Sequence, residues 1–189
     1  GGKTTGTVTV SNAIAISGTQ SEITAALVTT DTLVVAGTAT ATISDAAEVA
    51  ITATALSAIG GKTSGAVTVT NAIAISGTQA EITAALVTTD TLVVAATATV
   101  TSSDAMSVAE ANAVDAKTSG VITATLDTGD TASYSTLTGT GNAYTVTVND
   151  AGSTAITATA LSTLGGKTTG TVTVSNAIAI SGTQAEVTA

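Results

Sequence analysis

The chain has 189 residues with 13 acidic and four basic side chains, a formal net charge of −9, and no Cys, His, Pro, Trp or Phe. Because this charge repels phosphate groups, we expect no nucleic acid partner and no binding to anionic membranes, and no apolar run is long enough for membrane insertion. Nucleophilic catalysis needs a Ser, Thr or Cys beside a base. Since the chain has no His and no Cys, we expect it not to be an enzyme.

The apolar residues indicate a thin core. They make up 44% of the chain and are nearly all Ala, Val, Ile and Leu, with Tyr134 and Tyr144 as the only aromatics. Ordinary globular cores use aromatic side chains as bulky fillers. A core of small aliphatic residues is typical of a solenoid, in which each coil buries its apolar face against the next coil.

Internal repeats organise the whole sequence. The segment Asn12–Gln20 begins again at Asn71 and Asn176, so the offsets are 59 and 105 residues. Unequal offsets indicate a smaller unit that can be added or lost. A Thr/Val run followed by Asn or Asp marks that unit at seven positions: Asn12, Asp45, Asn71, Asp104, Asp127, Asp150 and Asn176. Their separations of 23 to 33 residues are typical of one coil of an α/β solenoid and too short for independent domains.

We therefore predict one continuous solenoid without separate domains, and we expect it to be a fragment of a longer chain. The predicted units are residues 1–31, 32–59, 60–90, 91–118, 119–139, 140–164 and 165–189.

Strict alternation of Thr and Val predicts the strands. In chain order these are residues 7–10, 66–69, 97–101, 144–148 and 171–174. A period of two with β-branched residues places Val on the buried face and Thr on the other face.

A capped helix is predicted to follow the first strand. Ser17–Gln20 matches a capping box, as do residues 76–79 and 181–184. Glu22 then lies in the first turn, where the helix dipole favours an acid. Ile23, Ala26 and Leu27 form one apolar stripe along this helix.

A second kind of helix is predicted to begin at Asp45–Glu48, in a similar way. Its apolar stripe is Val49, Ala53 and Leu56. Gly60-Gly61 is expected to end this helix, with Lys62 near its negative end.

The predicted unit is therefore a strand, an Asx turn, a capped helix and a stop made of Gly or Thr-Ser-Gly. Short links between strand and helix imply parallel strands with right-handed crossovers. The predicted fold is an α/β or mainly-β right-handed parallel solenoid of short strands and short capped helices, in about seven coils. A string of immunoglobulin-like sandwiches would need a longer period and buried aromatics, and the sequence has neither.

The Gly-Gly-Lys-Thr motif is similar to part of a phosphate-binding loop. A full loop needs a further Gly five positions before the second Gly, and Leu56 and Leu161 occupy those positions. The motif also follows a predicted helix, whereas a phosphate-binding loop precedes one. We therefore interpret it as a helix stop.

Two interpretations of the Asx positions remain open. The structural one is an Asx turn or helix N-cap, with stacked Asn bonding to the next coil as a ladder. The other is a calcium site formed by Asp104, Asp127, Asp130 and Asp150, because carboxylates in neighbouring coils repel each other and a hard cation relieves that repulsion. The calcium-binding nonapeptide of β-rolls is absent, and no other cofactor is expected.

Ranks of Thr allow a remote alternative function. Three of the predicted strands would align their Thr side chains across a flat sheet, as in ice-binding solenoids. They are the strand with Thr7 and Thr9 and the strands at 97–101 and 171–174. We expect residues 121–126 to interrupt these ranks. The simpler interpretation is an exposed or laterally packed face rich in a residue of high β-propensity.

The segments at 71–86, 89–95 and 114–120 resemble repeats of very large bacterial surface proteins, the β-strand-repeat and adhesin-like proteins common in cyanobacteria. The resemblance covers essentially the whole chain. It implies secretion, great length and a place in surface layers, fibrils or adhesion.

The function we expect is a structural repeat segment of a secreted extracellular filament, fibril or surface layer. The alternative is the stalk of a cell-surface adhesin, with or without calcium. The expected partner is a second copy of the chain itself, through end-to-end or lateral self-association, because uncapped sheet edges invite further strands.

Overall fold

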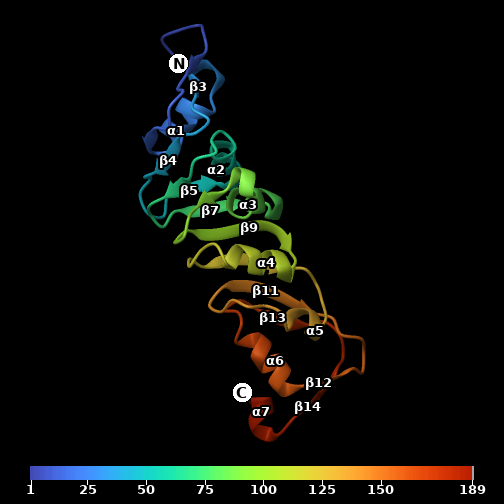
Figure 1. Ribbon diagram of the computed structural model, residues 1–189. Coiled ribbons are helices and arrows are strands. Elements are labelled where there is room, and N and C mark those ends of the chain that lie inside the picture. The colour runs from blue at the N-terminus through green and yellow to red at the C-terminus, as the bar shows by residue number, and fades with distance from the viewer. Residues whose placement is uncertain (189) are drawn as a thin grey trace.

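The computed structural model describes residues 1–188, which form an elongated stack of short strands and short helices (Figure 1). The N-terminus lies at one end of the stack and the C-terminus at the other. Chain segments therefore follow one another along the stack in sequence order.

Parallel pairing connects the strands of successive units. The strands are β1 (Val8–Thr9), β2 (Ala15–Gly18), β3 (Val34–Val35), β4 (Thr40–Ile43), β5 (Ala50–Thr52), β6 (Val67–Val69), β7 (Ala74–Gly77), β8 (Val93–Val94), β9 (Thr99–Met106), β10 (Ile122–Leu126), β11 (Ala143–Val148), β12 (Ala155–Thr157), β13 (Val172–Val174) and β14 (Ala179–Ser181). The larger sheets have the orders β2-β4-β6-β8 and β5-β7-β9-β10-β11-β13, and the pairs β1-β3 and β12-β14 complete the set. Paired residues are 20 to 26 positions apart. This confirms a mixed α/β fold with parallel sheets of short strands, which is compatible with a parallel solenoid.

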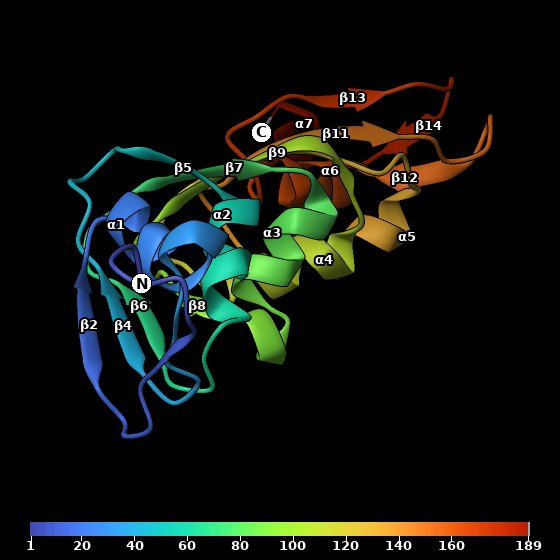
Figure 2. The same cartoon turned by 90° about the horizontal axis from the view of Figure 1, so that it is seen from above.

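Each predicted unit contains one α-helix. The helices are α1 (Gln20–Leu27), α2 (Ala53–Gly60), α3 (Gln79–Leu86), α4 (Val108–Asp115), α5 (Thr131–Tyr134), α6 (Ala158–Gly165) and α7 (Gln184–Thr188), with 3-10 turns η1 (Thr30–Thr32) and η2 (Thr89–Thr91). Viewed along the stack, α1, α2 and α3 lie within the angle between the two larger sheets (Figure 2). No helix in residues 1–188 is long and apolar enough to cross a membrane.

The core is a continuous column of aliphatic side chains. Ile51, Ile75, Val100 and Ile122 are in register on neighbouring strands, and each is at most 4% exposed. Ile23 and Leu27 of α1 are also buried, at 1% exposed. Ile75 and Val100 therefore each have a buried counterpart on the strand before and on the strand after.

The strand predictions are confirmed in place and in facing. The five predicted runs contain β1, β6, β13, most of β11 and the start of β9. In β11, Tyr144, Val146 and Val148 are buried while Thr145 is exposed. Alternation of β-branched residues therefore located both the strand and its buried face.

The predicted capping boxes are shifted by two residues. The N-cap of α1 is Thr19 and its box partner is Glu22, not the Ser17 and Gln20 expected from the sequence. The strand continues through Ser17 and Gly18 because they pair with Thr42 and Ile43 of the next unit. The other copies behave alike, with caps at Thr78 and Thr183.

The predicted helix start at Asp45–Glu48 is wrong. Glu48 has a φ of 65°, and its N–H donates to the carbonyl of Ala72 in the next unit, with an N–O distance of 2.8 Å. This turn leads into β5, so α2 begins at Ala53 after the cap Thr52. Ala53 and Leu56 are buried as expected. Gly60 is the last residue of α2 and Gly61 its C-cap, so the predicted stop is confirmed.

The Asx marks lie elsewhere in the unit than predicted. Five of them lie in turns between two strands of one unit: Asn12, Asp45, Asn71, Asp150 and Asn176. Asp104 lies within β9, and only Asp127 lies between a strand and a helix. The observed unit is therefore a strand, an Asx turn, a second strand and then a helix.

Copies of one sequence occupy different sheets. β2 and β7 both read AISG, but β2 belongs to the four-stranded sheet and β7 to the six-stranded sheet. The unit between them contributes three strands, β3, β4 and β5, and β4 pairs both with β2 and with β6. The second strand of this unit, β4, therefore pairs with β6, the first strand of the next unit, so the pairing is offset by one strand here.

Candidate functional site

The polar groups that recur along the stack are located at the junctions between units. Asp45 Oδ2 accepts a hydrogen bond from the backbone N–H of Gln20, one unit earlier, at 2.6 Å. Asp104 Oδ1 accepts one from the N–H of Gln79 at 2.6 Å. A carboxylate at the first turn of a helix satisfies a free backbone donor and favours the positive end of the helix dipole. These Asp residues therefore cap the helix of the preceding unit.

The third link of this kind joins α5 to the unit of β11. Asp150 Oδ2 accepts from the N–H of Thr131 at 2.8 Å and from its hydroxyl at 2.6 Å. The backbone carbonyl of Asp150 in turn accepts from Asn176 Nδ2 at 2.9 Å. At the equivalent place, Asn71 Nδ2 donates to the carbonyl of Asp45 at 2.7 Å. The predicted ladder of Asx side chains between units is thus present at both of these positions.

The four carboxylates of the calcium prediction have separate surroundings. Asp104 and Asp150 cap helices of preceding units, and Asp130 caps its own helix, α5, through the N–H of Ser133 at 2.7 Å. The backbone carbonyl of Asp127 accepts from the hydroxyl of Tyr134. In residues 1–188, no three acidic side chains are grouped closely enough to hold a metal ion. The four do not form one oxygen cluster, and calcium binding by any of them stays a prediction that calorimetry with millimolar calcium would check.

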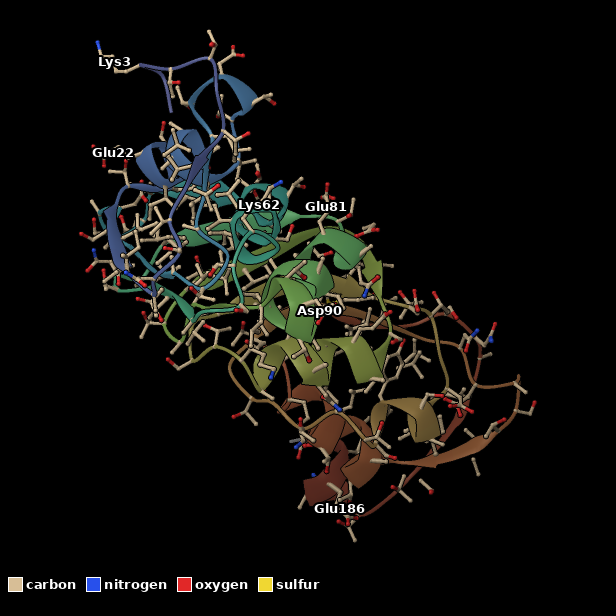
Figure 3. The ribbon with its side chains drawn as sticks, turned by 45° about the horizontal axis from the view of Figure 1, so that its top comes forward. Lys3, Glu22, Lys62, Glu81, Asp90 and Glu186 are labelled. Atoms are coloured by element: carbon tan, nitrogen blue, oxygen red, sulfur yellow. The ribbon has the colours of Figure 1, made fainter. Side chains whose placement is uncertain are left out.

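Two of the capping-box glutamates, Glu81 and Glu186, connect consecutive helices as well as capping their own helix. Glu81 Oε2 accepts from the N–H of Thr78 at 2.8 Å, and its Oε1 accepts from the hydroxyl of Thr54 on α2 at 2.7 Å. Glu186 accepts in the same way from the hydroxyl of Thr159 on α6, at 3.0 Å. The labelled Glu22, Glu81 and Glu186 are distributed from one end of the stack to the other (Figure 3).

These hydrogen bonds alter the acidity of the glutamates. The backbone N–H of each cap residue, Thr19, Thr78 or Thr183, holds the pKa of its glutamate below the ordinary value, and hydroxyl donors lower it further. At Asp130 the hydroxyl and the N–H of Ser133 lower the pKa in the same way. These carboxylates are therefore stabilised as anions, as helix caps are.

A Thr-x-Gly turn links chain segments that neighbour each other along the stack at three places. Thr63 and Thr118 donate through their hydroxyls to the carbonyls of Ala39 and Ala98, which lie 24 and 20 residues earlier in the chain, at 2.5 Å each. The same hydroxyl of Thr118 accepts from the N–H of Gly120 at 3.0 Å. We call this arrangement the Thr clamp, and it recurs at Thr168.

The glycine of the Thr clamp is required by close approach of the backbones. A Cβ on Gly65 would lie 2.1 Å from the carbonyl oxygen of Ala39, and one on Gly120 would lie 2.1 Å from that of Ala98. Atoms cannot approach so closely, so any larger residue would push the units apart. Sequence reasoning identified this motif as a helix stop but missed its role between units, although its recurrence with Gly two positions after Thr was the available signal.

Hydroxyl side chains form one outward rank on the six-stranded sheet. In register along the rank are Thr52, Ser76, Thr101 and Thr123, all exposed. Thr123 belongs to the segment expected to interrupt the ranks, so that expectation is wrong. The rank ends one strand later, at Ala143. In the first pair of strands the partner of Thr9 is Val35, so hydroxyl ranks are short and confined to single sheets.

Two buried groups near the middle of the stack were not singled out from the sequence. Asn142 is 3% exposed. Its Oδ1 accepts from the N–H of Ile122 at 2.8 Å, and its Nδ2 donates to Asp115 Oδ1 at 2.6 Å. Tyr144 is fully buried, and its Oη has no hydrogen-bond partner within residues 1–188. Burial raises the pKa of this tyrosine, with a smaller contribution from the charge of Asp115.

Taken together, the recurrent polar side chains are hydrogen-bonded across unit junctions, an arrangement suited to holding repeats in register. Comparison of the chain with protein-family models, with curated proteins and with solved structures gives no match.

Proposed function

We propose that this chain is a structural repeat segment of a secreted extracellular filament, fibril or surface layer. In this proposal the units are about seven coils of one right-handed parallel solenoid. The observation that carries it is the recurrence along the stack of two hydrogen-bonded links beside one continuous apolar core. These are the helix caps made by Asp45, Asp104 and Asp150 and the Thr clamps of Thr63, Thr118 and Thr168. Links of this kind are nearest-neighbour interactions, so stability grows with the number of units.

The resemblance to bacterial surface proteins supports an extracellular location. A Cys-free, acidic chain of small residues suits a protein that is exported and then stacks outside the cell. The partner in this proposal is a second copy of the same chain, and neither a nucleic acid nor a cofactor is required.

Electron microscopy of the purified chain over a range of concentrations tests the proposal. We expect rods that lengthen into regular filaments as concentration rises. Monomeric rods at every concentration would instead favour the adhesin stalk, and compact particles would contradict both. Surface labelling of intact cells that produce the chain tests its location, since an extracellular filament is labelled without lysis.

A further inference from the structure

A hollow lies between α5 and α6, in the interior of the stack. It has a volume of about 330 Å³, and the residues that line it all fall between positions 131 and 167. The two helices are neighbours and contact each other (Figure 1). We call this space the α5–α6 hollow, and it is formed by two consecutive units that are both present in the chain.

The short length of α5 explains why the space is there. Residues 158–165 of α6 differ from residues 53–60 of α2 at only two positions, so the two helices offer nearly the same surface to the helix before them. That preceding helix is α1, with eight residues, in the case of α2, and α5, with four residues, in the case of α6. About one turn of helix is therefore missing from the cover of α6.

Most of the surface of the hollow is hydrocarbon. Leu164 and Tyr134 line it and are otherwise buried, at 4% and 2% exposed, and Ala160 lies on the same wall. The hydroxyl of Tyr134 donates to the backbone carbonyls of Asp127 and Thr147. The tyrosine therefore offers its ring to the hollow, and its hydroxyl is already used.

The other hydroxyl groups around the hollow are also engaged as donors. Those of Thr131, Ser135 and Thr163 each donate to another group of the chain, at distances of 2.6 to 2.7 Å. A molecule in the hollow would therefore not receive a hydrogen bond from any of these three side chains. Its polar part must find another donor.

Lys167 supplies that donor, and it is half-buried at the edge of the hollow. No other charged side chain of residues 1–188 lines this space. Contacts inside the chain fix its position. The N–H of Lys167 donates to the carbonyl of Leu164 at 3.0 Å, and the hydroxyl of the next residue, Thr168, donates to the carbonyl of Tyr144 at 2.8 Å.

The equivalent lysine in the earlier copy has different surroundings. Lys62 lines another hollow, and the acidic side chain of Asp90 lines it as well. At Lys167 the positive charge has no such neighbour in the lining, so the α5–α6 hollow favours a negatively charged group. The net charge of −9 on the chain opposes this only weakly, because salt screens exposed charges beyond about 8 Å at physiological ionic strength.

We propose that the α5–α6 hollow binds a small amphipathic anion. Its apolar body lies against Leu164, Ala160 and the ring of Tyr134, and its carboxylate or sulfonate pairs with Lys167. The volume is at the lower end of the roughly 300–1,000 Å³ of small-molecule sites, which suits a medium-chain fatty acid or an aromatic acid. The bound molecule takes the place of the missing helical turn, and this site is independent of the proposed filament function.

Fluorescence of anilinonaphthalene sulfonate, an aromatic molecule with one anionic group, measures binding, and octanoate is the competitor. We expect one saturable site per chain. Lys167→Gln should weaken binding of both molecules about tenfold, because a hydrogen bond to a charged group is lost. Lys62→Gln is the matched control and should leave binding unchanged. Ala160→Phe fills the hollow and should abolish binding, with helix content checked by circular dichroism.

Octanol, which has the same apolar body without the charge, separates the two parts of the proposal. It should compete at least tenfold less well than octanoate. Equal competition by octanol, an equal loss of binding in Lys62→Gln, or the absence of a saturable site would overturn the proposal. If Ala160→Phe loses helix content, the comparison of Lys167→Gln with Lys62→Gln still decides.

Discussion

Truncating the same isoleucine in two copies of one sequence measures what a covering unit contributes to stability. Ile75 is 1% exposed and Ile180 is 53% exposed, while their neighbours in the sequence are nearly identical. Removing a fully buried isoleucine down to alanine costs about 2–5 kcal/mol, because transfer free energy is lost and a cavity is left. Ile180 keeps about half of that burial and borders an open hollow, so Ile180→Ala should cost only about 1 kcal/mol.

Urea unfolding followed by far-ultraviolet circular dichroism separates these two expectations. With a slope of about 2 kcal/mol per molar urea, Ile75→Ala should lower the midpoint by roughly 1–2.5 M and Ile180→Ala by roughly 0.5 M. The experiment is performed at a concentration where the chain is monomeric, so that no second copy covers Ile180. Equal shifts for the two variants would refute the idea that the neighbouring unit buries this position.

Three further predictions concern buried and capping groups. Tyr144→Phe removes a buried hydroxyl without a partner in residues 1–188, so thermal unfolding should show stability unchanged or raised by about 1 kcal/mol. Asp104→Ala removes the acceptor for the N–H of Gln79 and should cost about 1 kcal/mol in urea unfolding, whereas the exposed Asp90→Ala should stay within about 0.5 kcal/mol. The pKa of Glu81 is lowered in the folded chain, so its contribution to the free energy of unfolding is complete above its pKa in the unfolded chain and is lost as pH falls through its pKa in the folded chain. The urea midpoint should therefore drop in acid, and it should drop less in the Glu81→Gln variant.

The strands within residues 7–10, 66–69, 97–101, 144–148 and 171–174 and their buried faces were predictable because they depend on local alternation, whereas β2, β7 and β14, which follow the Asx turns, were not predicted. Tyr144, Val146 and Val148 are buried as a period of two requires. The helix caps were predicted at the wrong residues because the local sequence pattern is compatible with two helix starts. Ser17 and Thr19 are both good N-caps, and pairing of Ser17 with Thr42 of the next unit decides between them.

The junctions were less predictable because their partners are far apart in sequence. Nothing near Thr63 shows that its hydroxyl will meet the carbonyl of Ala39, 24 residues earlier. The same applies to Asp45 and the N–H of Gln20. The sequence shows that Asp45 occupies a recurring position. Recurrence alone does not tell whether its side chain caps a helix of another unit or forms a turn within its own unit.

The composition of the chain follows from these junctions. Glycine is needed where the backbone of one unit lies so close to a carbonyl of another that a Cβ would clash with it, as at Gly65 and Gly120. Threonine is needed at the Thr clamp, where its hydroxyl donates to one unit and accepts from its own turn. Aliphatic residues of moderate size fill most of the thin column between sheets and helices. Of the two tyrosines in it, Tyr134 donates its hydroxyl to backbone carbonyls, whereas the hydroxyl of Tyr144 has no partner within residues 1–188. A sequence selected for stacking of this kind converges on Thr, Ala, Gly, Val and Ile, whatever its ancestry, so the low diversity of the chain is a physical requirement of the repeated junction.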